Sequence, residues 1–187
     1  MENVLPEGFS LNLDFLSESE EKHLLSALAG LPYGEVRMHG VVAKRRVAQF
    51  GIHYAFESFK VTPTKPQPAD LDPIRERAAQ LAGVAAEDLA ETLVIEYPAG
   101  AGIGWHRDAP PFGIVIGISL GAPCRMRFQK GTGAEREVAA VVLPPRSLYI
   151  LDGPARWKWQ HTIPAVNELR YSITFRTLRQ VSARSPH

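Results

Sequence analysis

Apolar residues change their spacing along this chain near residue 92. Before that point, residues 17–30 carry a leucine stripe at helical spacing, between the capping residue Ser17 and a closing glycine. Residues 72–83 repeat this arrangement, with Asp72 as the expected N-cap and a glycine at the end. The first half of the chain is therefore predicted to contain two helices.

After residue 92 the apolar runs become short, and glycine, proline or charged turns separate them. Segments 45–50 and 52–59 are predicted to form one further hairpin. Many short strands behind two helices predict a mainly β fold with N-terminal helices and a double-stranded β-helix, or jelly-roll, core. The predicted core strands are 92–97, 114–120, 124–129, 136–143, 147–152, 158–163 and 170–176.

The chain of 187 residues fits one domain. We expect residues 1–91 to supply the helices and a possible substrate lid, residues 92–178 to form the jelly-roll core, and residues 179–187 to be a flexible tail. The N-terminus lacks the pattern of a signal peptide, and no apolar run approaches the roughly 20 residues of a membrane helix. We expect a cytoplasmic monomer without a membrane partner.

Composition narrows the classes of function. The chain is 45% hydrophobic and 22% charged with a net charge of +1, so no global basic field points to duplex nucleic acid, although a local patch is compatible with it. The single cysteine, Cys124, excludes an internal disulfide and a cysteine-based zinc site.

The stretch "WHRD" places a histidine and an aspartate two residues apart. If it is extended, His106 and Asp108 share one face and could take two adjacent sites on a metal. A second histidine, best supplied by His161, would complete the 2-His-1-carboxylate set that suits non-haem Fe(II). The simpler alternatives are a surface His–Asp pair and a core histidine satisfied by a carbonyl. His39 and His53 could instead touch a substrate.

The strand "RYSITFR" (170–176) carries two arginines on one face. Alternation gives one face to Tyr171, Ile173 and Phe175, and the other to Arg170, Ser172, Thr174 and Arg176. Buried arginines need anions, and guanidinium matches a carboxylate bidentately, so the pair could bracket a small dicarboxylate. The alternative is an edge strand whose polar face lies in water.

Together, "YPAGAGIGWHRD", "QHTIP" and "RYSITFR" resemble the AlkB family of Fe(II)/2-oxoglutarate dioxygenases, in the order typical of that family and over residues 92–178. The resemblance implies that His106, Asp108 and His161 bind Fe(II), and that 2-oxoglutarate and O2 are co-substrates. The residues expected at the 2-oxoglutarate site are Tyr97, Arg170, Ser172 and Arg176.

A weaker resemblance lies upstream, in "RRVAQFG". It is similar to the substrate lid of nucleic-acid demethylases, in which Arg45 and Arg46 could meet phosphate while Phe50 or Tyr54 stacks on a base. A charged hairpin edge is the alternative. Three departures affect the substrate and co-substrate contacts: Ile95 and Ser172 stand where familiar members have Asn, and "APPF" (109–112) replaces acidic residues after H-x-D.

The favoured hypothesis is a dioxygenase that oxidatively removes alkyl groups from nucleic-acid bases, as in DNA or RNA repair. Its partner would be alkylated single-stranded DNA or RNA rather than intact duplex, because the target base must be unstacked. Two alternatives remain open: the same chemistry on a protein or small molecule, and a metal- or 2-oxoglutarate-binding module without turnover.

Overall fold

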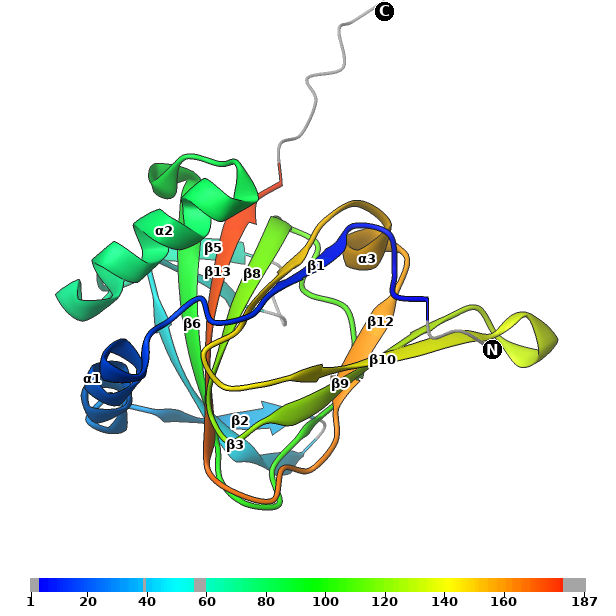
Figure 1. The fold of residues 1–187 in the computed structure, drawn as a ribbon, viewed down its shortest axis with the longest axis horizontal. Coiled ribbons are helices and arrows are strands. Elements are labelled where there is room, and N and C mark those ends of the chain that lie inside the picture. Colours follow the sequence, from blue (N-terminus) through cyan, green and yellow to red (C-terminus); the bar gives the residue numbers. More distant parts are fainter. Residues whose placement is uncertain (1–3, 39, 56–59, 180–187) are drawn as a thin grey trace, which may run out of the picture.

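The computed structural model describes residues 4–38, 40–55 and 60–179. Within them, antiparallel strands form two sheets that face one another, together with a small separate hairpin (Figure 1). The larger sheet has the strand order β1-β11-β8-β13-β6-β3-β2. Its strands are β1 (Phe9–Asn12), β11 (Leu148–Leu151), β8 (Phe112–Gly121), β13 (Arg170–Leu178), β6 (Leu89–Tyr97), β3 (Val41–Phe50) and β2 (Gly34–Met38).

The smaller sheet has the strand order β10-β9-β12-β7. Its strands are β10 (Glu137–Leu143), β9 (Cys124–Lys130), β12 (Gln160–Ile163) and β7 (Ile103–His106). The separate hairpin pairs β4 (Ile52–Ala55) with β5 (Lys60–Pro63). The helical elements are α1 (Glu18–Ala29), α2 (Asp72–Ala82), α3 (Gly153–Trp157), and the 3-10 turns η1 (Ala69–Leu71), η2 (Ala86–Asp88) and η3 (Gly133–Glu135).

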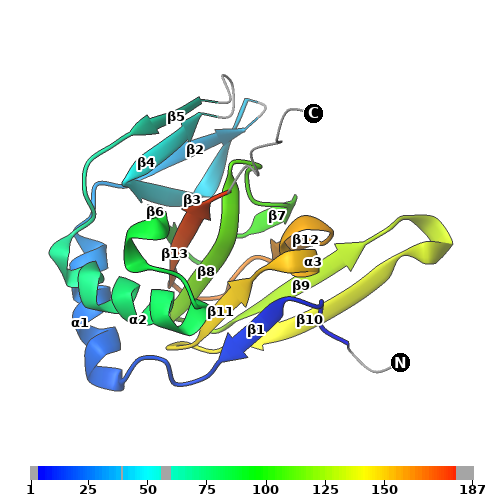
Figure 2. The same cartoon turned by 90° about the horizontal axis from the view of Figure 1, so that it is seen from above.

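The two long helices cover one face of the larger sheet, and the smaller sheet covers the other (Figures 1 and 2). One apolar cluster fills the space under the helices and includes Leu24, Ile74 and Phe175. A second cluster lies between the sheets and includes Met126 and Phe128. The central strands β6, β8 and β13 are therefore buried on both faces, while the end of the sheet formed by β2 and the start of β3 is exposed.

Both predicted helices are present. Ser17 and Glu20 form the predicted capping box, with the Glu20 amide donating to Ser17 Oγ at 3.2 Å. The prediction for Asp72 is wrong in detail, because the N-cap of α2 is Leu71 and no side chain caps it. The Asp72 carboxylate instead accepts a 2.6 Å hydrogen bond from Gln67 Nε2, while Gly83 closes the helix in the left-handed region as predicted.

The predicted hairpin of 45–50 with 52–59 is wrong. Strand β3 pairs with β2 and β6 in the larger sheet, whereas β4 pairs with β5, and residues 56–59 lie outside the described part of the chain. Gly51 separates the two strands with a φ of 82°. A Cβ atom there would lie 2.2 Å from the Ala90 carbonyl oxygen, so the chain turns away from β3 where only glycine fits.

Residues before 92 are part of the jelly-roll itself. They supply β1, β2 and β3 to the larger sheet and also the first residues of β6. The tail predicted at 179–187 falls outside the described residues except for Arg179. No helix among the described residues is long and apolar enough to cross a membrane.

Candidate active site

A cavity of about 350 Å³ opens between the two sheets. Its lining includes the predicted residues His106 of β7 and His161 of β12 in the smaller sheet, and Asp108, which follows β7. Tyr97 from β6 and Arg176 from β13 also line it. The fold thus gathers side chains that are far apart in the sequence around one open cavity.

The three predicted metal ligands are neighbours in space. His106 and His161 are paired across β7 and β12, with ring centroids 4.3 Å apart. Asp108 follows the end of β7, and its Oδ2 lies 3.7 Å from His161 Nε2. Asp108 and His161 are both buried, with 8% and 7% of their surface exposed. The H-x-D pair therefore lies beside the distal histidine, although Asp108 itself is outside strand β7.

The protonation states of these groups suit metal binding. Burial lowers the pKa of His161 to about 3, so the ring is neutral at physiological pH. Burial alone would raise the pKa of Asp108, but the charge of Arg176 holds it well below its usual range and keeps the carboxylate ionised. His106 Nδ1 donates to the Gly104 carbonyl at 2.8 Å, so Nε2 is the ring nitrogen that could bind a metal.

One atom in this group lacks a partner. Asp108 Oδ2 is buried, and no hydrogen-bond donor in the described part of the chain reaches it. A buried carboxylate oxygen without a partner is costly, and a cation beside two imidazoles would satisfy it. Among the described residues, no three His, Cys, Asp or Glu side chains already form a group that could hold a metal ion. The side chains of His106, Asp108 and His161 must therefore shift from their present positions to hold an ion together.

Arg176 orients the Asp108 carboxylate. Its Nε and a terminal nitrogen both donate to Asp108 Oδ1, with Nε at 2.9 Å, while the other terminal nitrogen donates to Glu91 Oε2 at 2.5 Å. Glu91 is fully buried and also accepts a 2.7 Å hydrogen bond from Gln49. Gln49 in turn is bonded to His53 at 2.6 Å, so a chain of hydrogen bonds runs from the cavity lining to Asp108.

Arg170 is the second cation of this face. It is fully buried, its Nε donates to Ser119 Oγ at 3.2 Å, and its guanidinium carbon lies 5.0 Å from the centre of the Tyr97 ring. Both terminal nitrogens lack a hydrogen-bond partner within the described residues. A buried guanidinium in this state calls for an anion. The two arginines thus differ: Arg176 is engaged by carboxylates and Arg170 is not.

The residues that replace the expected asparagines face each other. Ile95 and Ser172 are register partners on β6 and β13, and both line the cavity. Ser172 Oγ lies 3.5 Å from Thr174 Oγ1 on the same strand. At these positions the cavity has one pair of hydroxyl groups and an apolar side chain, where familiar members of the family have two asparagines. This part of the cavity therefore provides fewer hydrogen bonds.

The predicted lid residues separate. Arg45 lines the cavity, with a long hydrogen bond to the Gly102 carbonyl at 3.4 Å. Arg46 lies on the opposite face of β3 and pairs with Glu96, with a closest distance of 2.6 Å. Phe50 is 3% exposed in the core under the helices, so its predicted role as a stacking platform is not available in this structure. Tyr54 lies in β4, and its side chain is outside the described part.

The sequence reasoning missed Glu91 and Arg156. Glu91 belongs to the same face of β6 as Tyr97, and alternation would have identified it if the predicted strand had begun at residue 89. Arg156 of α3 is 2% exposed and donates to the carbonyls of Ala109, Phe112 and Gly113 at 2.8–2.9 Å. It ties down the loop that follows Asp108, and no sequence pattern marks that contact.

The sequence of this chain is similar to that of known proteins. The sequence profile of the 2OG-Fe(II) oxygenase superfamily matches residues 11–176. An Arabidopsis thaliana protein named alkylated DNA repair protein ALKBH8 homolog is 30% identical over 201 residues, which cover 94% of this chain and 56% of that protein. An Acanthamoeba polyphaga mimivirus protein named uncharacterized protein L905 is 30% identical over 194 residues, 91% of this chain and 85% of that protein.

A Xenopus tropicalis tRNA (carboxymethyluridine(34)-5-O)-methyltransferase alkbh8 is 28% identical over 164 residues, which cover 85% of this chain and 25% of that protein. The chain therefore spans about half the length of the plant relative and a quarter of the Xenopus relative.

Two solved structures share the fold. The structure of OsALKBH1 has a TM-score of 0.70 at 16% identity and covers 94% of this chain and 99% of that chain. The structure of a Pseudomonas putida prolyl-4-hydroxylase has a TM-score of 0.65 at 15% identity, and the match covers 92% of this chain and 93% of that chain. These similarities confirm the predicted jelly-roll core.

Proposed function

Because this chain belongs to the 2OG-Fe(II) oxygenase superfamily, we propose that it is an AlkB-like dioxygenase that oxidatively removes alkyl groups from nucleic-acid bases. Members of this superfamily use Fe(II), 2-oxoglutarate and O2. In the proposal, His106, Asp108 and His161 hold the iron, and Arg170, Tyr97 and Ser172 hold 2-oxoglutarate. Arg176, which was also expected at the 2-oxoglutarate site, instead orients Asp108, because its nitrogens already bind Asp108 and Glu91.

A single observation carries this assignment: among the described residues, two buried groups of opposite charge each keep atoms without a hydrogen-bond partner. Asp108 Oδ2 needs a cation, and the terminal nitrogens of Arg170 need an anion. An Fe(II) ion and a dicarboxylate satisfy both at once. The same superfamily chemistry requires that pair, so the unmet charges and the family assignment agree.

The chain's own groups position and shield the reactants. When bound, iron and 2-oxoglutarate supply the oxidising power with O2. Arg170, which is buried beside Tyr97 rather than in the cavity lining, pairs with a carboxylate of 2-oxoglutarate. Arg176 fixes the Asp108 carboxylate from the other end of β13. Ile95, Leu93 and Val115 line the space between and keep water away from the reacting atoms.

The proposed substrate is an unstacked base in single-stranded DNA or RNA. Arg37, Arg45 and Arg107 line the cavity and give it cationic groups that can meet phosphate. The name of the plant relative, an alkylated DNA repair protein, supports nucleic acid as the substrate class. A base must leave its stack to enter a cavity between two sheets, which favours single strands over intact duplex.

An anaerobic titration with Fe(II) and 2-oxoglutarate, followed by visible absorption, tests the site. We expect a metal-to-ligand charge-transfer band that disappears in Asp108→Ala and weakens in Arg170→Ala. The control is Asp70→Ala, because Asp70 is exposed and pairs with His23 on the helix side. A band that survives both site substitutions would refute the assignment.

A panel of methylated single-stranded DNA, methylated RNA and methylated peptides then tests the substrate. Formaldehyde should appear with the oligonucleotides and not in the Asp108→Ala variant. Formaldehyde released only from peptides would overturn the nucleic-acid proposal while leaving the iron site in place.

A further inference from the structure

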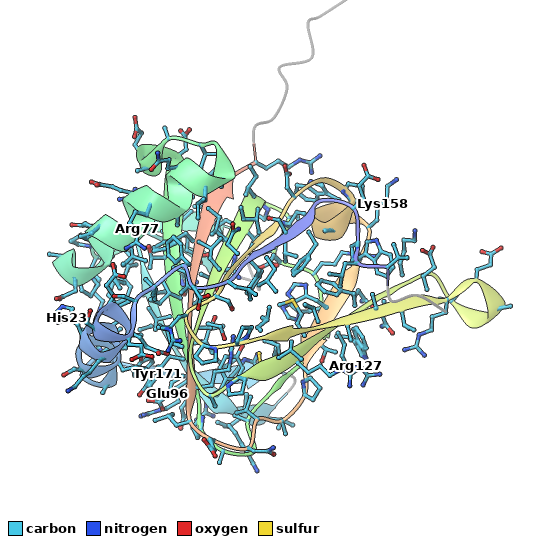
Figure 3. All side chains as sticks on the ribbon, viewed as in Figure 1. His23, Arg77, Glu96, Arg127, Lys158 and Tyr171 are labelled. Atoms are coloured by element: carbon cyan, nitrogen blue, oxygen red, sulfur yellow. The ribbon has the colours of Figure 1, made fainter. Side chains whose placement is uncertain are left out.

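The smaller sheet has an outer face that the proposed site does not use. Along β9, Cys124, Met126 and Phe128 are buried toward the cavity, while Arg125 and Arg127 are exposed on the opposite side. Figure 3 shows Arg127 on the side of β9 turned away from the space between the sheets. Two arginines on one strand face are about 7 Å apart along the backbone.

Neighbouring strands extend this face without adding negative charge. On β10, Val142 lies opposite Arg125 and Ala140 lies opposite Arg127. On β12, Thr162 lies opposite Arg127. The next outward position on β9 is Gln129, opposite Val138 and Gln160. The outward positions of these three described strands contain no aspartate or glutamate.

A third arginine joins the face from the turn before β10. Arg136 is exposed and donates to Gln129 Oε1 at 2.6 Å, and Gln129 donates to Gln160 Oε1 at 2.8 Å. Within the described residues, none of Arg125, Arg127 and Arg136 forms an ion pair with a carboxylate. The chain as a whole has 21 basic and 20 acidic residues, so this is a local concentration of positive charge.

The face is continuous with the cavity lining through β7. The guanidinium of Arg127 lies 5.7 Å from the centre of the Trp105 ring. Trp105 immediately precedes His106, and Arg107, two residues further, is exposed and lines the cavity. A ligand lying along Arg125, Arg127 and Trp105 would therefore reach Arg107 at the cavity.

We infer that this outer arginine face, defined by Trp105, Arg125, Arg127, Gln129 and Arg136, binds the phosphate backbone of the single-stranded nucleic acid whose base enters the cavity. Guanidinium groups match phosphate oxygens bidentately, and single-strand sites combine a cationic track with an aromatic side chain. The inference rests on the proposed function, which it deepens by giving the strand a path outside the cavity.

The test measures binding and does not need catalysis. Binding of a fluorescein-labelled, unmodified single strand of about 16 nucleotides is followed by anisotropy over a range of salt concentrations. In Arg125→Gln/Arg127→Gln we expect about tenfold weaker binding and a salt slope lower by about 1.4, since each lost single-strand phosphate contact removes about 0.7. Arg125→Lys/Arg127→Lys keeps the charge and should recover most of the slope.

The charge-matched control is Lys22→Gln/Lys65→Gln, because both lysines are exposed and removed from this face. It should bind the strand like the wild type. An arginine double variant that behaves like this control would overturn the inference, as would a wild type that binds anionic lipid vesicles but no oligonucleotide.

Two further measurements separate this inference from the proposed function. The charge-transfer band with Fe(II) and 2-oxoglutarate should be the same in the arginine double variant and the wild type, because the substituted side chains point away from the cavity. If the variant loses strand binding but the wild type demethylates no oligonucleotide, the face stands and the proposed dealkylation fails. If oligonucleotides are demethylated equally well by both, the dealkylation stands and the face fails.

Discussion

Glu91 holds the charge network behind Asp108, and replacing it tests whether that network matters. Glu91→Gln keeps the size of the side chain but removes the charge that faces Arg176 at 2.5 Å in a fully buried position. Breaking a buried ion pair costs about 3–5 kcal/mol, but Asp108 continues to pair with Arg176. We therefore expect the free energy of unfolding to fall by about 2–3 kcal/mol, which is near the strength of one hydrogen bond to a charged group.

The same substitution should weaken metal binding. Without Glu91, the guanidinium of Arg176 loses one of its two anchors, and the Asp108 carboxylate that it fixes becomes less well oriented. Partners of metal ligands are typically worth about 10–100-fold in metal affinity. The melting temperature of the metal-free protein should fall by about 4–12 °C. The Fe(II) titration in the presence of 2-oxoglutarate should require a metal concentration about 10–100-fold higher.

Glu96→Gln is the matched control on the same strand. Glu96 is also buried, at 6% exposed, but it lies on the other face of β6, where Arg46 and the Tyr171 hydroxyl bind it. Figure 3 shows Glu96 and Tyr171 together on the side nearer to α1. This variant should lose stability and keep its iron affinity. Equal iron affinity in both variants, or a stability loss below about 0.5 kcal/mol in Glu91→Gln, would refute the reasoning.

Three further outcomes are expected. Arg170→Met should leave the melting temperature of the ligand-free protein unchanged or raised, because it removes a buried guanidinium with two unpartnered nitrogens. Calorimetry should nevertheless show at least about tenfold weaker 2-oxoglutarate binding. A variant that binds 2-oxoglutarate with wild-type affinity would contradict the role given to Arg170. Ser17→Ala should cost about 1 kcal/mol in urea unfolding through loss of the capping box, with turnover per folded molecule unchanged. The metal-free protein should lose stability as pH falls from 6.5 toward 3, because the unfolded chain takes up a proton that buried His161, with a pKa of about 3, does not accept. His161→Gln should flatten this dependence by up to about 1.4 kcal/mol per pH unit, and an unchanged slope would count against the cause.

The alternation of β13 could be predicted because the strand is central in a sheet covered on both sides. Tyr171, Ile173 and Phe175 pack under the helices, as predicted. The polar face turns to the space between the sheets and carries the fully buried Arg170 at the start of the strand. A strict period of two leaves no other arrangement once one face must be apolar.

The short helix α3 could not be predicted from spacing. It has five residues, too few for a helical repeat, and its Arg156 and Ala155 are buried while Trp157 is 38% exposed. The run predicted as a strand at 158–163 therefore starts at residue 160. Trp157 and Trp159 do not line the cavity, since Trp157 belongs to α3 and Trp159 packs in the core between the sheets.

The lid prediction treated two adjacent arginines as one basic group, and the strand separates them. Because neighbours in a strand point to opposite faces, only one of Arg45 and Arg46 can face the cavity. Which one does so is decided by pairing with β6, where Arg46 lies opposite Glu96 on the face toward the helices. The sequence shows neither where β6 begins nor which strand pairs with it. Which residues of "RRVAQFG" face the cavity could therefore not be predicted from the sequence. The same rule puts Phe50 on the face of Arg46, which explains why both leave the cavity together.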